Sequence, residues 1–334
     1  MITETRRANV ATPRRFVRLD QAGRWLRRRS VREALTFYLF ISPWGLGLLC
    51  LTLFPFAMGV LISFTNYDGI SPINLVKFTG FANYARALDD RLALQTFSRT
   101  VGFSLWLVPL LLIASMGLAL LLQQGVKGLG AFRAVFYLPT LFPVVTTALI
   151  WLTITNKNAG LLNAAISLVR PGTAINWLGE YALLVLTLLM VWSGAGQGMV
   201  VFLAGLQGIS RELKEAAMID GASSWQVFRC VTLPLLTPVI FFQLLVSLIA
   251  ALQIFVQTVL LTPGTGGGAQ YGLGRVPKPS IYMYMNYVMV QILGFQRFGY
   301  GTALLWLFFV ALVLVALVMY KTGGYWVYYE VEQD

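Results

Sequence analysis

The sequence predicts an all-α integral membrane protein with six transmembrane helices. Of its 334 residues, 57% are hydrophobic and only 11% are charged, whereas soluble domains carry about 25% charged residues. The charges are also unevenly distributed, because six windows contain no Asp, Glu, Lys or Arg. Each window provides the roughly 20 apolar residues that a helix needs to cross the hydrocarbon core of a bilayer. These windows are 35–64, 101–123, 134–155, 181–206, 233–262 and 299–320.

The first window follows a strongly basic segment. Residues 1–34 hold ten arginines and only three acidic residues. A basic run directly before a first span marks the cytoplasmic side and favours anionic lipid headgroups. We therefore expect residues 1–34 to form a cytoplasmic tail that contacts membrane lipids, and we do not attribute the net charge of +12 to nucleic-acid binding. With six spans across 35–320, residues 321–334 are expected to form a second cytoplasmic tail.

One window and one outer loop depart from a simple pattern. Pro139 and Pro143 interrupt the window 134–155, although helices in membranes tolerate proline. The outer segment 263–298 is rich in glycine and proline, which predicts an irregular loop. The aromatic residues that follow within it are typical of a helix at the membrane surface; they are Tyr282, Tyr284 and Tyr287.

The sequence carries no pattern for catalysis or for a bound cofactor. It contains no histidine, and its two cysteines form no metal-ligand pattern. The run GTGGG at 264–268 lacks the lysine and the hydroxyl residue that complete a phosphate-binding loop. We therefore expect no catalytic residue, no metal site and no cofactor in this chain. If ATP drives the protein, another chain must bind it.

The charged segment 207–234 lies between two apolar windows and has the local pattern of a helical hairpin. Ser210 is a good N-cap for a first helix, and Gly221 suits the left-handed position that ends it. Ser223 and Gln226 have the spacing of a capping box for a second helix. Pro234 is expected in the first turn of the following span.

The charge pattern of the hairpin favours contact with a protein. Ala216 and Ala217 leave one side of the first helix nearly smooth, beside three acidic residues. The alternative is an amphipathic helix on the cytoplasmic leaflet, but such helices favour lysine and arginine on their polar face. We therefore favour docking of the hairpin into a groove of a soluble partner.

The segment EAAMIDGASSWQVFRCVTLP resembles the EAA loop of permeases in binding-protein-dependent ABC importers. The added Asp220 and the segments FTGFANY at 78–84 and FGYGTA at 298–303 are similar to the carbohydrate-uptake, maltose-type branch. The resemblance implies a type I importer permease fold in which this loop is the coupling helix. It also implies that the residues matching the motif contact an ATPase: Glu215, Ala216, Ala217, Asp220, Gly221, Leu233 and Pro234.

The resemblance further implies a set of partners and a location. The partners are a second homologous permease subunit, a cytoplasmic ATPase dimer that holds ATP and Mg²⁺, and an extracytoplasmic sugar-binding protein. The chain itself would be a transporter subunit and not an enzyme. It would lie in the cytoplasmic (inner) membrane of a bacterium or archaeon, with both termini in the cytoplasm.

The absence of charge within the windows indicates a neutral solute, because ion-coupled carriers commonly use intramembrane carboxylates. Polar residues in three windows recur at about helical spacing and are candidates for the pathway of a sugar: Thr147, Trp151, Ser193, Gln197, Gln243, Ser247 and Gln257. The competing interpretation is that these groups bond between helices, as Ser, Thr and Gln often do in membranes.

Alternative functions remain open at this point. The same architecture could import another solute such as glycerol 3-phosphate, although the windows offer no basic group for a phosphate. An ion-coupled carrier or a membrane scaffold without transport activity would not need the charged hairpin.

Overall fold

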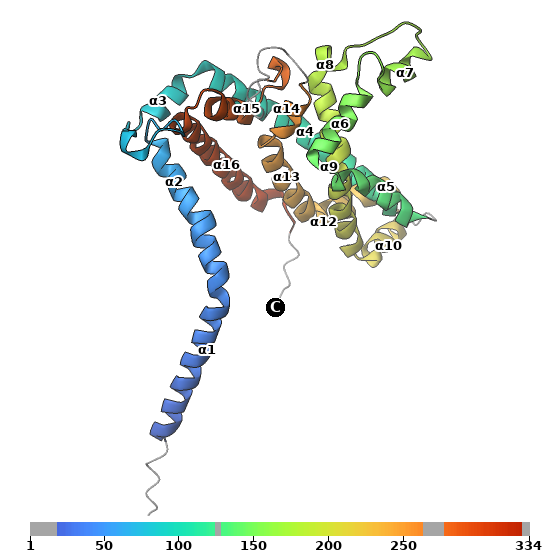
Figure 1. Ribbon diagram of the computed structural model, residues 1–334. Helices are drawn as coiled ribbons and strands as arrows, with labels where there is room; N and C mark the ends of the chain where they lie inside the picture. Colours follow the sequence, from blue (N-terminus) through green and yellow to red (C-terminus); the bar gives the residue numbers. More distant parts are fainter. Residues whose placement is uncertain (1–18, 124–127, 263–276, 329–334) are drawn as a thin grey trace, which may run out of the picture. The chain divides into compact units, whose positions relative to one another are not determined.

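The computed structural model describes residues 19–123, 128–262 and 277–328, and this part of the chain is helical and contains no β-strand (Figure 1). The glycine run at 264–268 lies outside the described residues, as do residues 1–18 and 329–334. The α-helices are α1 (Leu19–Gly47), α2 (Phe54–Ser63), α3 (Ala82–Asp89), α4 (Arg91–Gln123), α5 (Leu129–Leu141), α6 (Val144–Ile154), α7 (Leu161–Ser167), α8 (Trp177–Glu180), α9 (Ala182–Gly208), α10 (Arg211–Ile219), α11 (Ser224–Val227), α12 (Leu233–Leu235), α13 (Thr237–Leu252), α14 (Val256–Leu260), α15 (Tyr284–Met289) and α16 (Phe298–Trp326). Shorter turns of other helix types are η1 (Leu48–Leu53), η2 (Ile73–Leu75), η3 (Phe228–Thr232), η5 (Pro279–Ile281) and η6 (Val290–Gly294).

The chain divides into two compact units, Met1–Gly59 and Val60–Asp334. In the first unit α1 begins at Leu19, so the second half of the predicted N-terminal tail is helical. The helix then continues through η1 into α2, and Glu33–Ser63 is an apolar span of 31 residues. At the other end of the chain, α16 continues to Trp326, so the predicted C-terminal tail is helical over its first six residues.

Four helices of the described part are long and apolar enough to cross a membrane, and the number rises to six if each of two bent pairs counts as one span. The four are Glu33–Ser63, Arg91–Gln123, Ala182–Gly208 and Phe298–Trp326. They coincide with the first, second, fourth and sixth predicted windows, and this agreement confirms the all-α membrane fold.

The third predicted window is not one continuous helix. It forms α5 and α6, which meet at an angle of 101°. Pro143 has no N–H to donate to the carbonyl of Pro139 and forces the preceding Phe142 into an extended conformation. The Phe142 N–H bonds to the Pro139 carbonyl instead, at 3.3 Å. The two prolines therefore break this span, although membrane helices often tolerate a single proline.

The fifth predicted window is also broken, in two places. The helical segment Ser224–Leu235 and α13 meet at 65°. At the other end, α13 stops at Leu252 and α14 starts only at Val256. The backbone of Phe255 between them has φ −146° and ψ −63°, which is not helical.

The core of the second unit is the contact of α9 with α4, α5 and α13. Small residues let these helices approach closely, as is common between membrane helices. A Cβ at Gly196 of α9 would lie 2.2 Å from the Phe136 carbonyl oxygen of α5, so only glycine fits there. Thr140 Oγ1 of α5 also donates to the Ser193 carbonyl oxygen of α9 at 3.0 Å.

Two segments that carried the sequence resemblance, 78–84 and 298–303, both contact the turn that follows α2. Asn83 Nδ2 donates to the carbonyl oxygens of Ser63 and Thr65 at 2.9 and 2.8 Å. Gly299 lies against the same turn, because its Cβ would be 2.0 Å from the Thr65 carbonyl oxygen. The end of α2 and the start of α16 are thereby fastened together.

The tyrosines that were expected at the membrane surface are buried instead. Tyr282, Tyr284 and Tyr287 lie in a core cluster with residues of α4 and α16. The aromatic side chains of this segment therefore fill the interior of the unit, and the expectation that they lie at the surface is wrong.

Asp90, directly before α4, connects this cluster to two other helices. Its Oδ1 accepts from the N–H groups of Leu92 and Ala93 at 3.0 and 3.1 Å, while its Oδ2 accepts from the hydroxyls of Tyr287 and Tyr300. Burial alone would raise the pKa of the Asp90 carboxyl, but these hydrogen bonds outweigh burial and lower it. A depressed pKa means that the stabilisation is present above the ordinary Asp pKa and is lost as the pH falls through the folded value.

Asp90→Asn is expected to lower the free energy of unfolding by about 1–3 kcal/mol, because an amide nitrogen cannot accept from two tyrosine hydroxyls. The matched control is Asp89→Asn, since Asp89 is an adjacent but exposed carboxylate. Thermal unfolding of the purified protein in detergent at neutral pH measures both. Equal melting temperatures for the two variants would contradict the role of Asp90.

Candidate coupling and translocation sites

The charged hairpin has the caps that its sequence predicts. Ser210 Oγ accepts from the Glu212 N–H at 3.2 Å and starts α10. Ser223 and Gln226 form a complete capping box at the start of α11, because each side chain accepts from the backbone N–H of the other. Both helix starts are therefore confirmed, and both depend on residues within three positions of the cap.

The turn between the two helices is a Schellman motif centred on Gly221. Gly221 has φ +85°, a conformation in which a Cβ is unfavourable. Its N–H donates to the Met218 carbonyl oxygen at 3.1 Å, and the Ala222 N–H donates to that of Ala217 at 3.0 Å. The predicted role of Gly221 in ending α10 is thus confirmed, and the turn fixes the direction of the hairpin.

The hairpin presents apolar side chains that the described part of the chain leaves uncovered. Ile219 is 86% exposed and Trp225 is 67% exposed, with the Trp225 ring stacked on Phe228 at 5.4 Å. Beside them Glu215 pairs with Arg211 at 2.9 Å on the exposed face of α10, a surface ion pair that contributes little stability. Of the two alanines, Ala216 is exposed and Ala217 is half-buried. Glu215, Ala216, Asp220, Ile219 and Trp225 are thus all exposed on the hairpin, and we call this set the hairpin surface.

Leu233 and Pro234 lie in the helical segment that leaves the hairpin. Pro234 does not start the next span, as was expected, because α11, η3 and α12 continue helically through it. The wide π-helical turn η3 ends at Thr232, two residues before the proline. The span begins instead at Thr237, with Pro238 in its first turn, so the proline that suits a helix start is the second of the two.

The candidate pathway residues of the third and fourth windows differ in exposure. Thr147 is buried and donates to the Pro143 carbonyl oxygen at 3.1 Å, and Ser193 donates to that of Leu189 at 2.8 Å. Trp151 lies with its ring 6.3 Å from that of Trp192, and its buried Nε1 has no hydrogen-bond partner in the described part of the chain. Gln197 is exposed. These two hydroxyls bond within their own helices, whereas Gln197 keeps an exposed amide and the Trp151 indole N–H is buried without a partner in the described part of the chain.

Gln243 and Ser247 lie in a closed seam between α13, α4 and α9. Gln243 is only 7% exposed, and its Nε2 donates to Ser247 Oγ at 3.2 Å. Gly198 of α9 and Ser115 of α4 complete the seam, since a Cβ on Gly198 would lie 2.4 Å from Ser115 Oγ and 3.3 Å from Gln243 Nε2. This placement favours helix packing for Gln243 and Ser247 over contact with a solute.

Gln257 does not continue the polar face of Gln243 and Ser247 on one helix, because the break at Phe255 separates α13 from α14. Gln257 is half-buried on α14. The neighbouring Thr258 donates to Asn286 Oδ1 at 2.9 Å. Asn286 is fully buried and also accepts from the Met283 N–H at 3.1 Å. Asn286 positions α14 and was missed, because nothing local to its sequence indicates a partner 28 positions away.

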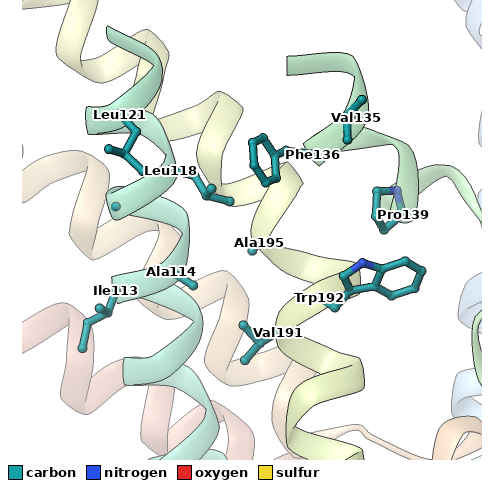
Figure 2. A pocket seen from close by; sticks show the side chains of 11 residues that line it. Ile113, Ala114, Leu118, Leu121, Val135, Phe136, Pro139, Val191, Trp192 and Ala195 are labelled. Carbon is teal, nitrogen blue, oxygen red and sulfur yellow. The ribbon is translucent and has the colours of Figure 1, made fainter. Parts of the chain in front are cut away.

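A pocket of about 520 Å³ opens between α4, α5 and α9 (Figure 2). Its lining is apolar and includes Phe136, Pro139 and Trp192, and none of the candidate pathway residues lines it. This lining offers few of the hydrogen-bond partners that a sugar needs. No cluster of three or more potential metal ligands occurs among the described residues.

Comparison with known proteins gives consistent matches over most of the chain. The family model described as "Binding-protein-dependent transport system inner membrane component" matches residues 87–322. The chain is 34% identical to the probable ABC transporter permease protein YesP of Bacillus subtilis, over 92% of this chain and 96% of that protein. It is 33% identical to the trehalose/maltose transport system permease protein MalF of Thermococcus litoralis, over 88% and 95%.

The fold is likewise similar to a solved structure. A chain of a bacterial ABC transporter involved in the import of the acidic polysaccharide alginate superimposes with a TM-score of 0.74 at 20% identity, covering 89% of this chain and 97% of the other. The match shows a shared overall fold.

Proposed function

Because the chain belongs to the family of binding-protein-dependent transport system inner membrane components, we propose that it is the permease subunit of an ATP-driven importer that carries a sugar. The family comprises transport components, so the chain is a multi-pass transporter subunit and not an enzyme. A separate ATPase would hold ATP and Mg²⁺.

The hairpin surface is the observation that supports coupling to an ATPase. It joins a rigid, doubly capped backbone to exposed Ile219 and Trp225. Large apolar side chains exposed together mark contact with a partner, and the acidic residues Glu215 and Asp220 disfavour anionic lipid.

The further partners follow from this assignment. We infer a heterodimer with a second homologous permease, and a sugar-binding protein on the outer side. The hairpin can meet a cytoplasmic ATPase only if both termini are cytoplasmic in a six-span arrangement, in the inner membrane of a bacterium or archaeon. The arginine-rich tail supports the same orientation.

A sugar is supported by two independent observations. Several relatives carry names that refer to sugar transport, among them the trehalose/maltose permease and a lactose transport system permease protein of Rhizobium radiobacter, 30% identical over 78% of this chain. The predicted windows also contain no charged residue that would bind an ionic solute.

Co-expression with the second permease and the ATPase tests the proposal. An affinity tag on this chain should retain both partners in detergent. Proteoliposomes of the complex, supplied with the binding protein, should accumulate a labelled neutral oligosaccharide only when ATP is present on the hairpin side. A stable complex that transports no member of an oligosaccharide panel, but does transport glycerol 3-phosphate, would contradict the sugar assignment. Absence of the ATPase from the purified complex would contradict the importer.

A further inference from the structure

The bend between α12 and α13 lacks part of the hydrogen bonding that keeps a helix straight. In a regular helix the N–H of residue 238 would donate to the carbonyl of Pro234, but Pro238 has no N–H. Thr237 Oγ1 donates to the Pro234 carbonyl oxygen instead, at 2.6 Å. A side chain thus replaces the missing backbone donor at the 65° bend.

The same hydroxyl is held by the C-terminal segment. The backbone N–H of Tyr328 donates to Thr237 Oγ1 at 2.8 Å. A hydroxyl can donate one hydrogen bond and accept others, so the Thr237 hydroxyl links the Tyr328 N–H to the Pro234 carbonyl oxygen through two consecutive hydrogen bonds. Tyr328, the second residue after the end of α16, is therefore connected to the last turn of the helix that leaves the hairpin.

Packing around the relay holds the segment Gly323–Tyr328, the C-terminal strap, against the first turns of α13. The ring of Trp326 lies 5.7 Å from that of Phe241 at 67°. A Cβ on Gly323 would approach the Phe241 ring to 3.1 Å, so a small residue lets α16 come close. Val327 is only 8% exposed. One apolar contact and one hydrogen-bond relay thus act on the same bend.

We propose that the C-terminal strap sets the angle between α12 and α13, and so makes the fifth span follow movements of the hairpin. A bend with a missing backbone hydrogen bond is expected to be flexible. A flexible bend would change its angle when the hairpin moves, and α13 would then not follow that movement. Anchored to α16, the bend passes the motion to α13. The inference rests on the proposed coupling of the hairpin to an ATPase and assigns Thr237 and Tyr328 as positioning residues for that coupling.

The test removes one N–H group from the assembled importer. In Tyr328→Pro the donor is absent, while Val327 already has the extended conformation that a following proline requires, with φ −88° and ψ 121°. The matched control Tyr328→Ala keeps the N–H and removes only the side chain. In proteoliposomes of the full complex, Tyr328→Pro should bind the ATPase and hydrolyse ATP normally but transport about fivefold less sugar per ATP, at the lower end of typical coupling between sites. Tyr328→Ala should retain the wild-type ratio.

A second pair of variants interrupts the relay at its centre. Thr237→Val has nearly the same shape without the hydroxyl, and Thr237→Ser restores the hydroxyl. The valine variant should lower the ratio of transport to hydrolysis as Tyr328→Pro does, and the serine variant should recover it. If Tyr328→Pro fails to assemble, Thr237→Val and Thr237→Ser still test whether the hydroxyl relay is needed for coupling.

The failure of this inference differs from a failure of the proposed function. Wild-type ratios in both Tyr328→Pro and Thr237→Val, within a wild-type complex that transports, would overturn the strap. A wild-type chain that binds no ATPase or imports no solute would overturn the function itself. Loss of assembly in Thr237→Val together with Thr237→Ser would also overturn the strap, because the hydroxyl would then be irrelevant.

Discussion

Combining Gly221→Val with Glu215→Lys should abolish both ATPase binding and uptake while the chain still inserts and folds. At φ +85° the valine is strained by roughly 1–2 kcal/mol, and β-branching adds to this strain. No atom lies within 4 Å of a Cβ at this position, so the damage is confined to the backbone of the turn. Glu215→Lys reverses a charge on the hairpin surface and removes the pair with Arg211. Retention of the ATPase on the tagged permease, and uptake, are the measurements.

A matched control shows whether the effect depends on strain at the hairpin or on backbone strain anywhere in the chain. Gly172, in the segment between α7 and α8, has φ +83° and equally open space. Gly172→Val thus carries a similar conformational cost away from the hairpin and should bind the ATPase normally. Gly221→Asn should also retain function, because asparagine tolerates the left-handed region. Full transport by the combined variant would show that the hairpin does not dock.

The hairpin could be predicted because its signals are local. A cap residue and its partner are two or three positions apart, as in Ser210 with Glu212 or Ser223 with Gln226. Gly221 likewise acts through its own backbone angle. Such features depend little on the rest of the fold, so the sequence indicated them correctly.

The broken spans were harder to predict because a proline removes a backbone hydrogen bond, which breaks a helix, while the surrounding membrane helices often compensate for that loss. Composition marks 134–155 as one span, and nothing in that composition indicates an angle of 101°. The deciding feature is the spacing of Pro139 and Pro143. In a continuous helix the N–H of residue 143 would donate to the carbonyl oxygen of residue 139, and proline has no N–H. Pro234 and Pro238 have the same spacing at the second bend, so a proline four residues after a proline lies at both bends of more than 40° between helix pairs in the described part of the chain.

Contacts between distant segments could not be predicted from the sequence alone. Asp90 bonds to residues 197 and 210 positions away, and Tyr328 bonds to Thr237 across 91 positions. None of these three pairs has a recognisable spacing in the sequence. For the same reason the polar residues of the spans could be identified as candidates, while their partners could not.

The structure divides the candidate pathway residues into two groups with different expected phenotypes. Gln243 bonds to Ser247 inside a closed seam, so Gln243→Leu should lower the yield of assembled complex. Gln257 is half-buried on a separate short helix, and Trp151 has an indole N–H without a partner in the described part of the chain. A sugar hydroxyl would satisfy such groups, so Gln257→Leu and Trp151→Ala should affect uptake.

Gln257→Leu and Trp151→Ala are each expected to lower uptake about tenfold at normal complex yield, the equivalent of about 1.4 kcal/mol and within the range for a polar partner left unsatisfied. Trp151→Phe is the control for Trp151, because it keeps a smaller aromatic face while it removes the indole N–H. Uptake and yield must be measured on the same preparation. Reduced yield for Gln257→Leu would instead make Gln257 a tie between helices. Normal yield with normal uptake would remove Gln257 from both roles, and the same result for Trp151→Ala would place the solute pathway away from the ring pair of Trp151 and Trp192.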